Sequence, residues 1–75
     1  MALRLSRSER RFLHETIRHG TGEARLHRRA RIVLLASEGE TISEIARKVG
    51  TSRSRVLEWI RRFEQSRLEG LTDCQ

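Results

Sequence analysis

Four arginines lie between residues 52 and 62 of this 75-residue chain, in the stretch SRSRVLEWIRR. A guanidinium group is a planar fork that can donate two parallel hydrogen bonds to a phosphate or to the edge of a guanine base. Ser54 carries a hydroxyl that can bond with several different bases, and a helix start at Ser52 can donate backbone N–H groups to a phosphate. These residue types therefore point to the recognition of anions and base edges.

The composition of the whole chain supports a polyanionic partner. The formal net charge is +6 and the pI about 11.4, and of sixteen basic residues only Lys48 is a lysine. Such a bias towards arginine favours a nucleic acid, and a membrane surface is the other anionic partner that it leaves open. Hydrophobic residues make up 36% and aromatics 4% of a short chain, which leaves little room for a catalytic cleft. We therefore expect neither an enzyme nor a small-molecule substrate.

Metal, redox and membrane chemistry find little support in the sequence. His14, His19, His27 and Cys74 match no common zinc spacing, and a single cysteine allows no internal disulfide. No apolar run approaches the roughly twenty residues of a membrane span, and MALRL is too short for a signal peptide. We expect no cofactor, no metal, no membrane partner, and a cytoplasmic, nucleoid-associated location.

Helix signals recur along the chain, and proline is absent. Ser6 and Glu9 have the spacing of a capping box, as do Thr41 and Glu44. Gly20, Gly39 and Gly50 stand where helices commonly end. The apolar residues between these signals recur at helical spacing. The pattern predicts an all-α fold, a single domain over residues 1–75, with helices over residues 7–19, 23–38, 42–49 and 52–66. Residues 67–75 are expected to form a frayed exit, in which Leu68 and Leu71 can fold back on the core.

The break at Gly50 between two predicted helices is the most informative feature of the predicted fold. Two helices joined by a tight glycine turn cross steeply, so the second projects from the body and can enter the major groove of DNA. Val56, Trp59, Ile60 and Phe63 form an apolar stripe on this second helix. The residues predicted to contact DNA are those outside the stripe: Ser52, Arg53, Ser54, Arg55, Leu57, Glu58, Arg61 and Arg62.

The predicted contacts divide into base readers and phosphate binders. Arg53 enters the groove first and is expected to bond guanine, while Leu57 suits a thymine methyl. Glu58 either accepts from cytosine or pairs with Arg55 or Arg62 on its own helix. Arg55, Arg62 and Arg67 are suited to phosphates, which fix the register without carrying sequence information.

Several motifs together resemble a known family. The segments RRARIVLLA, IARKVG, SRSRVLEWIRRF and LEGL are similar in order and spacing to the N-terminal DNA-binding region of IS630-type transposases, relatives of the Tc1/mariner group. The resemblance covers roughly residues 23 to 71. It implies a homeodomain-like trihelical helix-turn-helix with an additional N-terminal helix, and binding to transposon terminal repeats. The family's Asp/Asp/Glu catalytic domain has no counterpart in this sequence, so the resemblance implies DNA binding and not strand transfer.

Other functions remain as alternatives to sequence-specific binding of double-stranded DNA. The chain is either the DNA-binding part of a transposase or a regulator derived from one. A helical protein–protein interaction module without DNA binding would show an exposed apolar patch, and only Leu57 is expected to point outward. RNA readers usually expose several aromatic side chains, whereas the three aromatics here fall on predicted core stripes. Glu38, Glu40 and Glu44 offer an acidic surface to a second copy, so a homodimer is also an alternative.

Overall fold

The computed structural model describes residues 3–19 and 24–71, and its elements are all helical. The order is α1 (Arg7–His19), α2 (Ala24–Ser37), α3 (Ile42–Val49), α4 (Arg53–Ser66) and the 3-10 helix η1 (Arg67–Leu71). The predicted all-α fold is confirmed. Two predicted bounds need correction: α2 ends at Ser37 rather than residue 38, and α4 begins at Arg53 because Ser52 is its N-cap. The predicted start of the second helix at residue 23 lies outside the described residues.

Local capping chemistry explains where the helices begin. The Ser6 N–H donates to Glu9 Oε1 at 2.8 Å and the Glu9 N–H donates to Ser6 Oγ at 3.1 Å, so the predicted capping box is present. Thr41 Oγ1 accepts from the Glu44 N–H at 3.1 Å. At the start of α4, Ser52 Oγ accepts from the Arg55 N–H at 3.2 Å. Each cap satisfies a backbone donor that the first helical turn leaves without a partner.

Glycines with positive φ explain where α2 and α3 end. Gly39 has φ 90° and Gly50 has φ 83°, a region that side chains with a Cβ rarely adopt. The N–H groups of Gly50 and Thr51 both donate to the Ala46 carbonyl at 2.9 Å. This left-handed cap closes α3 and turns the chain into α4 within a few residues.

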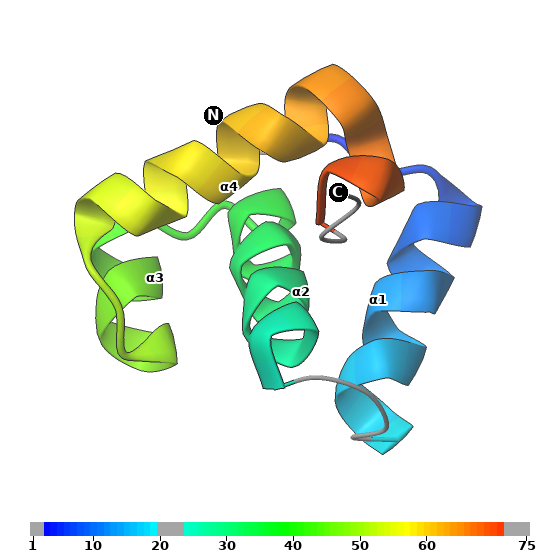
Figure 1. Ribbon diagram of the computed structural model, residues 1–75, viewed down its shortest axis with the longest axis horizontal. Coiled ribbons are helices and arrows are strands. Elements are labelled where there is room, and N and C mark those ends of the chain that lie inside the picture. Colours follow the sequence, from blue (N-terminus) through cyan, green and yellow to red (C-terminus); the bar gives the residue numbers. More distant parts are fainter. Residues whose placement is uncertain (1–2, 20–23, 72–75) are drawn as a thin grey trace.

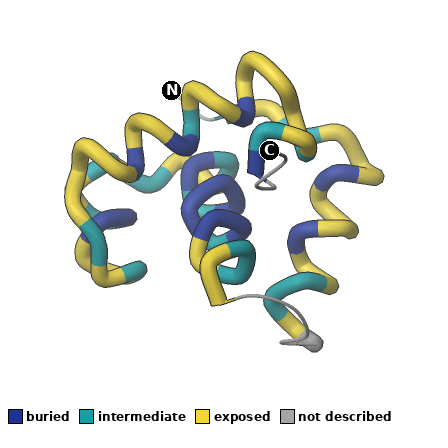
Figure 2. Tube along the Cα trace, in the orientation of Figure 1, coloured by how far each residue is buried: buried dark blue, intermediate teal, exposed yellow. Residues whose placement is uncertain are grey.

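α2 is the central helix of the fold. It packs against α1, α3, α4 and η1, and Figure 1 shows α1 and α3 on its two sides with α4 crossing its end. The buried residues follow this arrangement, since the dark segments of the tube in Figure 2 face α2 from every neighbouring helix. The core contains Leu13, Ala30, Ile32, Val33, Leu34, Ala36, Ile45, Ala46, Val56, Trp59, Phe63 and Leu71.

The segment directly after α4 forms the ordered 3-10 helix η1 rather than a frayed exit, and it folds back onto the core as expected for Leu71. Leu71 is fully buried, and its carbonyl accepts a hydrogen bond from Arg29 Nη1 at 3.0 Å. Gly70 passes so close to the Arg62 backbone that a Cβ at this position would collide with the Arg62 carbonyl. A glycine is therefore needed here for space rather than for an unusual dihedral angle.

Two further expectations about side chains are wrong. Phe12, placed on a core stripe from sequence, is 41% exposed, because α1 turns Leu13 towards α2 instead. Arg29, a charged residue for which an exposed position is the usual expectation, is only 8% exposed. Its guanidinium carbon lies 4.0 Å from the centre of the Trp59 ring, so a cation–π contact and the Leu71 carbonyl both help to offset its burial.

Candidate nucleic-acid interface

The inner face of α4 fixes the direction in which its other residues point. Val56, Trp59 and Phe63 are buried against the rest of the core. Since these positions are three and four residues apart, they lie on one face of the helix. Eight of the residues predicted to contact DNA lie outside this face and are exposed: Ser52, Arg53, Ser54, Arg55, Leu57, Glu58, Arg61 and Arg62. The structure thus gathers them on the free surface of one helix and the cap that precedes it.

The middle of this surface is hollowed. Ser54, Leu57, Glu58, Arg61, Arg62 and Gln65 line a shallow groove on the outer side of α4. Leu57 is 46% exposed beside it. The groove combines hydroxyl, guanidinium, carboxylate and aliphatic groups, which are the groups that distinguish base pairs in the major groove. Gln65 is a member that the sequence reading did not name, although it lies at helical spacing from Glu58 and Arg61.

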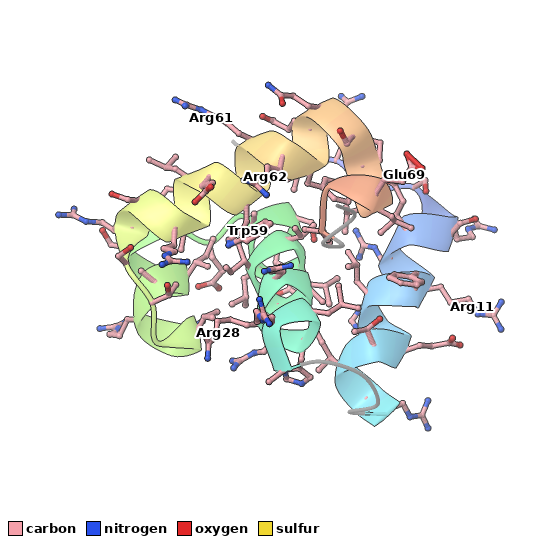
Figure 3. All side chains as sticks on the ribbon, viewed as in Figure 1. Arg11, Arg28, Trp59, Arg61, Arg62 and Glu69 are labelled. Carbon is pink, nitrogen blue, oxygen red and sulfur yellow. The ribbon has the colours of Figure 1, made fainter. Side chains whose placement is uncertain are left out.

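The arginines of α4 differ in their surroundings. Figure 3 shows Arg61 pointing away from α2, while Arg62 lies back over Trp59. The Arg62 guanidinium carbon is 4.9 Å from the Trp59 ring centre, and Arg62 Nη2 lies 3.3 Å from Glu58 Oε2. Of the two roles left open for Glu58, the structure contains the intrahelical pair with Arg62. Both side chains of that pair are about half exposed, so the pair is weak and can be exchanged for another partner.

A second basic hollow lies between α2 and the start of α4. It has a volume of about 290 Å³ and is lined by Arg25, Arg28, Arg29, Ile32, Thr51, Arg55 and Trp59. Figure 3 shows Arg28 pointing outward from α2 on the side of α3. Sequence reasoning assigned Arg55 to a phosphate but missed Arg25 and Arg28, which reach the same hollow from a different helix. Their position off the apolar face of α2 indicated that they are available for binding. That they share a hollow with Arg55 depends on how α2 packs against α4.

Arg67 does not join this surface. Its Nε donates to Glu9 Oε2 at 2.8 Å and its Nη2 to Glu9 Oε1 at 2.6 Å, and Nη2 also donates to the Arg4 carbonyl at 3.0 Å. The hydrogen bonds from Arg67 lower the pKa of Glu9 to about 2, against the opposing effect of its burial. The expected phosphate contact of Arg67 is therefore replaced by a structural ion pair between α1 and η1.

Neither a metal site nor a membrane span is visible in the described parts of the chain. Residues 3–19 and 24–71 bring no group of three metal-ligating side chains together. None of the helices that the structure describes is both long enough and apolar enough to cross a bilayer. Of the histidines considered as zinc ligands, His14 and His27 belong to no such group within the described residues, and Cys74 lies outside them.

Comparison with known proteins identifies the class of domain. A model of a helix-turn-helix domain family matches residues 28–73. This span includes α2 from residue 28 onward, the α3–turn–α4 unit and η1, and it is more than half of the 75 residues. The chain therefore belongs to this helix-turn-helix domain family.

A curated relative narrows the identification. The chain is 39% identical over 67 residues to the insertion element IS630 uncharacterized 39 kDa protein of Shigella sonnei. The match covers 89% of this chain and 19% of that protein, so the chain spans about a fifth of the relative's length. With the family match, it confirms the resemblance to the helix-turn-helix region of IS630-type transposases. No solved structure matches the chain well enough to extend the comparison.

Proposed function

We propose that this chain binds double-stranded DNA in a sequence-specific way, as the DNA-binding part of a transposase or of a regulator derived from one. The observation that carries the proposal is the outer surface of α4. Eight residues of this helix and its cap are exposed there, on the side away from the buried face formed by Val56, Trp59 and Phe63. Membership of the helix-turn-helix domain family and the IS630 relative support it. No catalytic step is assigned to this chain.

The start of α4 is proposed to read bases. Arg53 follows the N-cap directly and is exposed, and the first turns of such a helix enter the major groove most deeply. Ser54 and Leu57 follow on the same outer side and line the groove of α4. Arg61 lies further along that groove. We assign the main base contact to Arg53, with Leu57 and Arg61 as further readers.

Phosphates are proposed to bind on both sides of this reading surface. Arg62 lies more than two turns beyond Arg53, where the helix is expected to leave the groove, and its weak pair with Glu58 can be exchanged for a phosphate. On the other side, Arg28 and Arg55 line the hollow between α2 and α4. A phosphate in that hollow would be bound from two helices at once, which fixes the register of α4 on the duplex.

The experiment compares Arg53→Ala with Arg62→Ala, two variants with the same change of charge. A preferred duplex is first selected from a random pool, and both variants are then titrated on that duplex and on a random one at several salt concentrations. Arg53→Ala should lose about 1–3 kcal/mol on the preferred duplex and blur one base pair of the selected site. Arg62→Ala should weaken both duplexes by similar factors and reduce the salt slope by about one.

Other outcomes would contradict specific parts of the proposal. Equal losses on both duplexes for Arg53→Ala would limit that residue to phosphate contact. A salt dependence that is flat for the unmodified chain would refute nucleic-acid binding as a whole, because counterion release accompanies every arginine–phosphate contact.

The alternative of a protein–protein interaction module gains little from the structure. Phe12 and Leu57 are the large apolar side chains that are exposed among the described residues, and they lie on different helices. An interaction surface usually presents a contiguous apolar patch. DNA binding therefore remains the better supported function.

A further inference from the structure

The outer side of α1 carries basic side chains that the proposed function does not use. Arg7, Arg11, His14 and Arg18 are spaced i, i+4, i+7 and i+11, so they fall on one face of the helix, with Arg10 beside them. We call these five residues the α1 stripe. All five are exposed, and together with Glu15 they line one open hollow on the surface.

The charge of this face is largely uncompensated. This face carries four arginines and one glutamate, Glu15. The other acidic residue of α1, Glu9, is bound to Arg67 on the inner side of the helix. Arg11 Nε lies 3.7 Å from Glu15 Oε2, and both side chains are more than half exposed, so this pair neutralises little. Within the described residues, Arg7, Arg10 and Arg18 form no ion pair. The exposed side of α4, by comparison, carries four arginines and two glutamates, so its net positive charge is smaller.

The α1 stripe points in a different direction from the reading surface of α4. α1 packs on the side of α2 opposite to α3 (Figure 1). In Figure 3, Arg11 points outward from α1 and Arg61 outward from α4, on separate sides of the molecule. α1 also lies outside the family match, which begins at residue 28. A straight duplex held by α4 would therefore leave the α1 stripe free.

The chemistry of α1 favours a nucleic-acid backbone over a lipid surface. A helix that lies on a membrane inserts its apolar face, but Leu13 and Ile17 of α1 are already packed against the core. Phe12 is the one large apolar side chain exposed on this helix. The distance from Arg7 to Arg18 is about 16 Å at the helical rise of ~1.5 Å per residue. This length corresponds to roughly five phosphates of one strand along the axis of a duplex.

We propose that the α1 stripe is a second DNA-binding surface, so that one molecule can bridge two duplexes, one on α4 and one on α1. The proposal rests on the proposed function, since the first duplex is the one held by α4. Contact with the second duplex is through phosphates, because the stripe is a row of arginines on a helix that lies along the surface of the fold. The second contact should therefore show little sequence preference.

The experiment measures single-duplex binding and bridging separately. Two short duplexes carrying a donor and an acceptor fluorophore are mixed with protein, and energy transfer between them reports bridging, while anisotropy of one duplex reports binding. The test variant is Arg11→Gln with Arg18→Gln, at two exposed positions. The matched control is Arg53→Gln with Arg61→Gln, which removes the same charge from α4. Thermal melts of both variants verify that the fold is retained.

The α1 variant should bind a single duplex with nearly unchanged affinity and bridge about tenfold more weakly at moderate salt, as expected for two lost phosphate contacts. The α4 variant should lose single-duplex affinity first.

Bridging that survives in the α1 variant, or no bridging by the unmodified chain, overturns the proposal while leaving the function of α4 intact. Equal losses of binding and bridging in the α1 variant place the stripe on the first duplex and also overturn it. Binding of anionic phosphatidylserine vesicles through the stripe, without bridging, assigns it to a membrane. Failure to bind any duplex refutes the proposed function itself.

Discussion

Neutralising Glu9 should destabilise the domain in a way that depends on pH. Its carboxylate holds the Arg67 guanidinium through two hydrogen bonds of 2.8 and 2.6 Å, and its pKa falls from the ordinary 4.5 to about 2. At ~1.36 kcal/mol for each tenfold change in proton affinity, this difference corresponds to at most about 3.4 kcal/mol. The Arg67 side chain is 45% exposed, so solvent screening reduces the expected contribution to about 1–2 kcal/mol.

Glu9→Gln is the suitable perturbation because glutamine keeps an acceptor for the Ser6 N–H of the capping box. A loss of about 1–2 kcal/mol at pH 7 would lower the melting temperature by between about 4 and 16 °C for a domain of this size. A carboxylate with a depressed folded pKa stabilises the protein above its unfolded pKa, and this contribution disappears as the pH falls from about 5 towards 2. The difference between parent and variant should thus shrink to less than roughly half by pH 3.

The assay is urea denaturation of the parent, Glu9→Gln, Arg67→Met and the double variant at pH 7 and pH 3. The double-mutant cycle isolates the pair, because Arg67 also donates to the Arg4 carbonyl and lies over the Phe63 ring. A coupling energy near zero at pH 7, or one that is the same at pH 3, would show that the ion pair does not stabilise the attachment of α1 to η1.

Changes at three further positions test the caps and turns around α3 and α4, and thermal melts measure each variant. Thr41→Ala removes the side-chain acceptor for the Glu44 N–H and should cost on the order of 1 kcal/mol; a melt unchanged from the parent would mean that water replaces the cap. Gly50→Val should cost more, since φ is 83° there, whereas Gly50→Asn should be better tolerated. Equal melts for these two Gly50 variants would refute the argument from backbone conformation. Gly70→Ala should destabilise the domain because its Cβ would collide with the Arg62 carbonyl, and a melt equal to that of the parent would show that η1 can move away at little cost.

Features set by neighbouring residues could be predicted from the sequence. The caps at Ser6, Thr41 and Ser52 and the left-handed glycines at residues 39 and 50 depend on atoms within a few positions along the chain. For this reason the helix ends were predicted to within one residue where they are described. The exposure of the eight residues of α4 and its cap followed from the apolar stripe on the same helix. Their contact with DNA stays a prediction.

Features set by distant residues could not be predicted in this way. Arg67 is 58 residues from Glu9, and Arg29 is 42 residues from Leu71. In a chain with this many arginines, spacing along the sequence does not show which guanidinium a carboxylate or a carbonyl will meet. Whether Phe12 or Leu13 faces α2 likewise depends on how α1 docks, because the two are adjacent on one apolar side.

Trp59 gives the molecule a built-in optical probe at the edge of its proposed interface. The chain has one tryptophan and no tyrosine, so near-ultraviolet emission excited at long wavelength comes from a single indole. That indole is 8% exposed and lies close to two cations, Arg29 at 4.0 Å and Arg62 at 4.9 Å. Arg29 is held in the core by the Leu71 carbonyl, whereas Arg62 is half exposed and pairs with Glu58 at the surface. If Arg62 turns towards a phosphate as proposed, the electric field across the ring changes, and a shift in the wavelength of emission should report duplex binding without any added label.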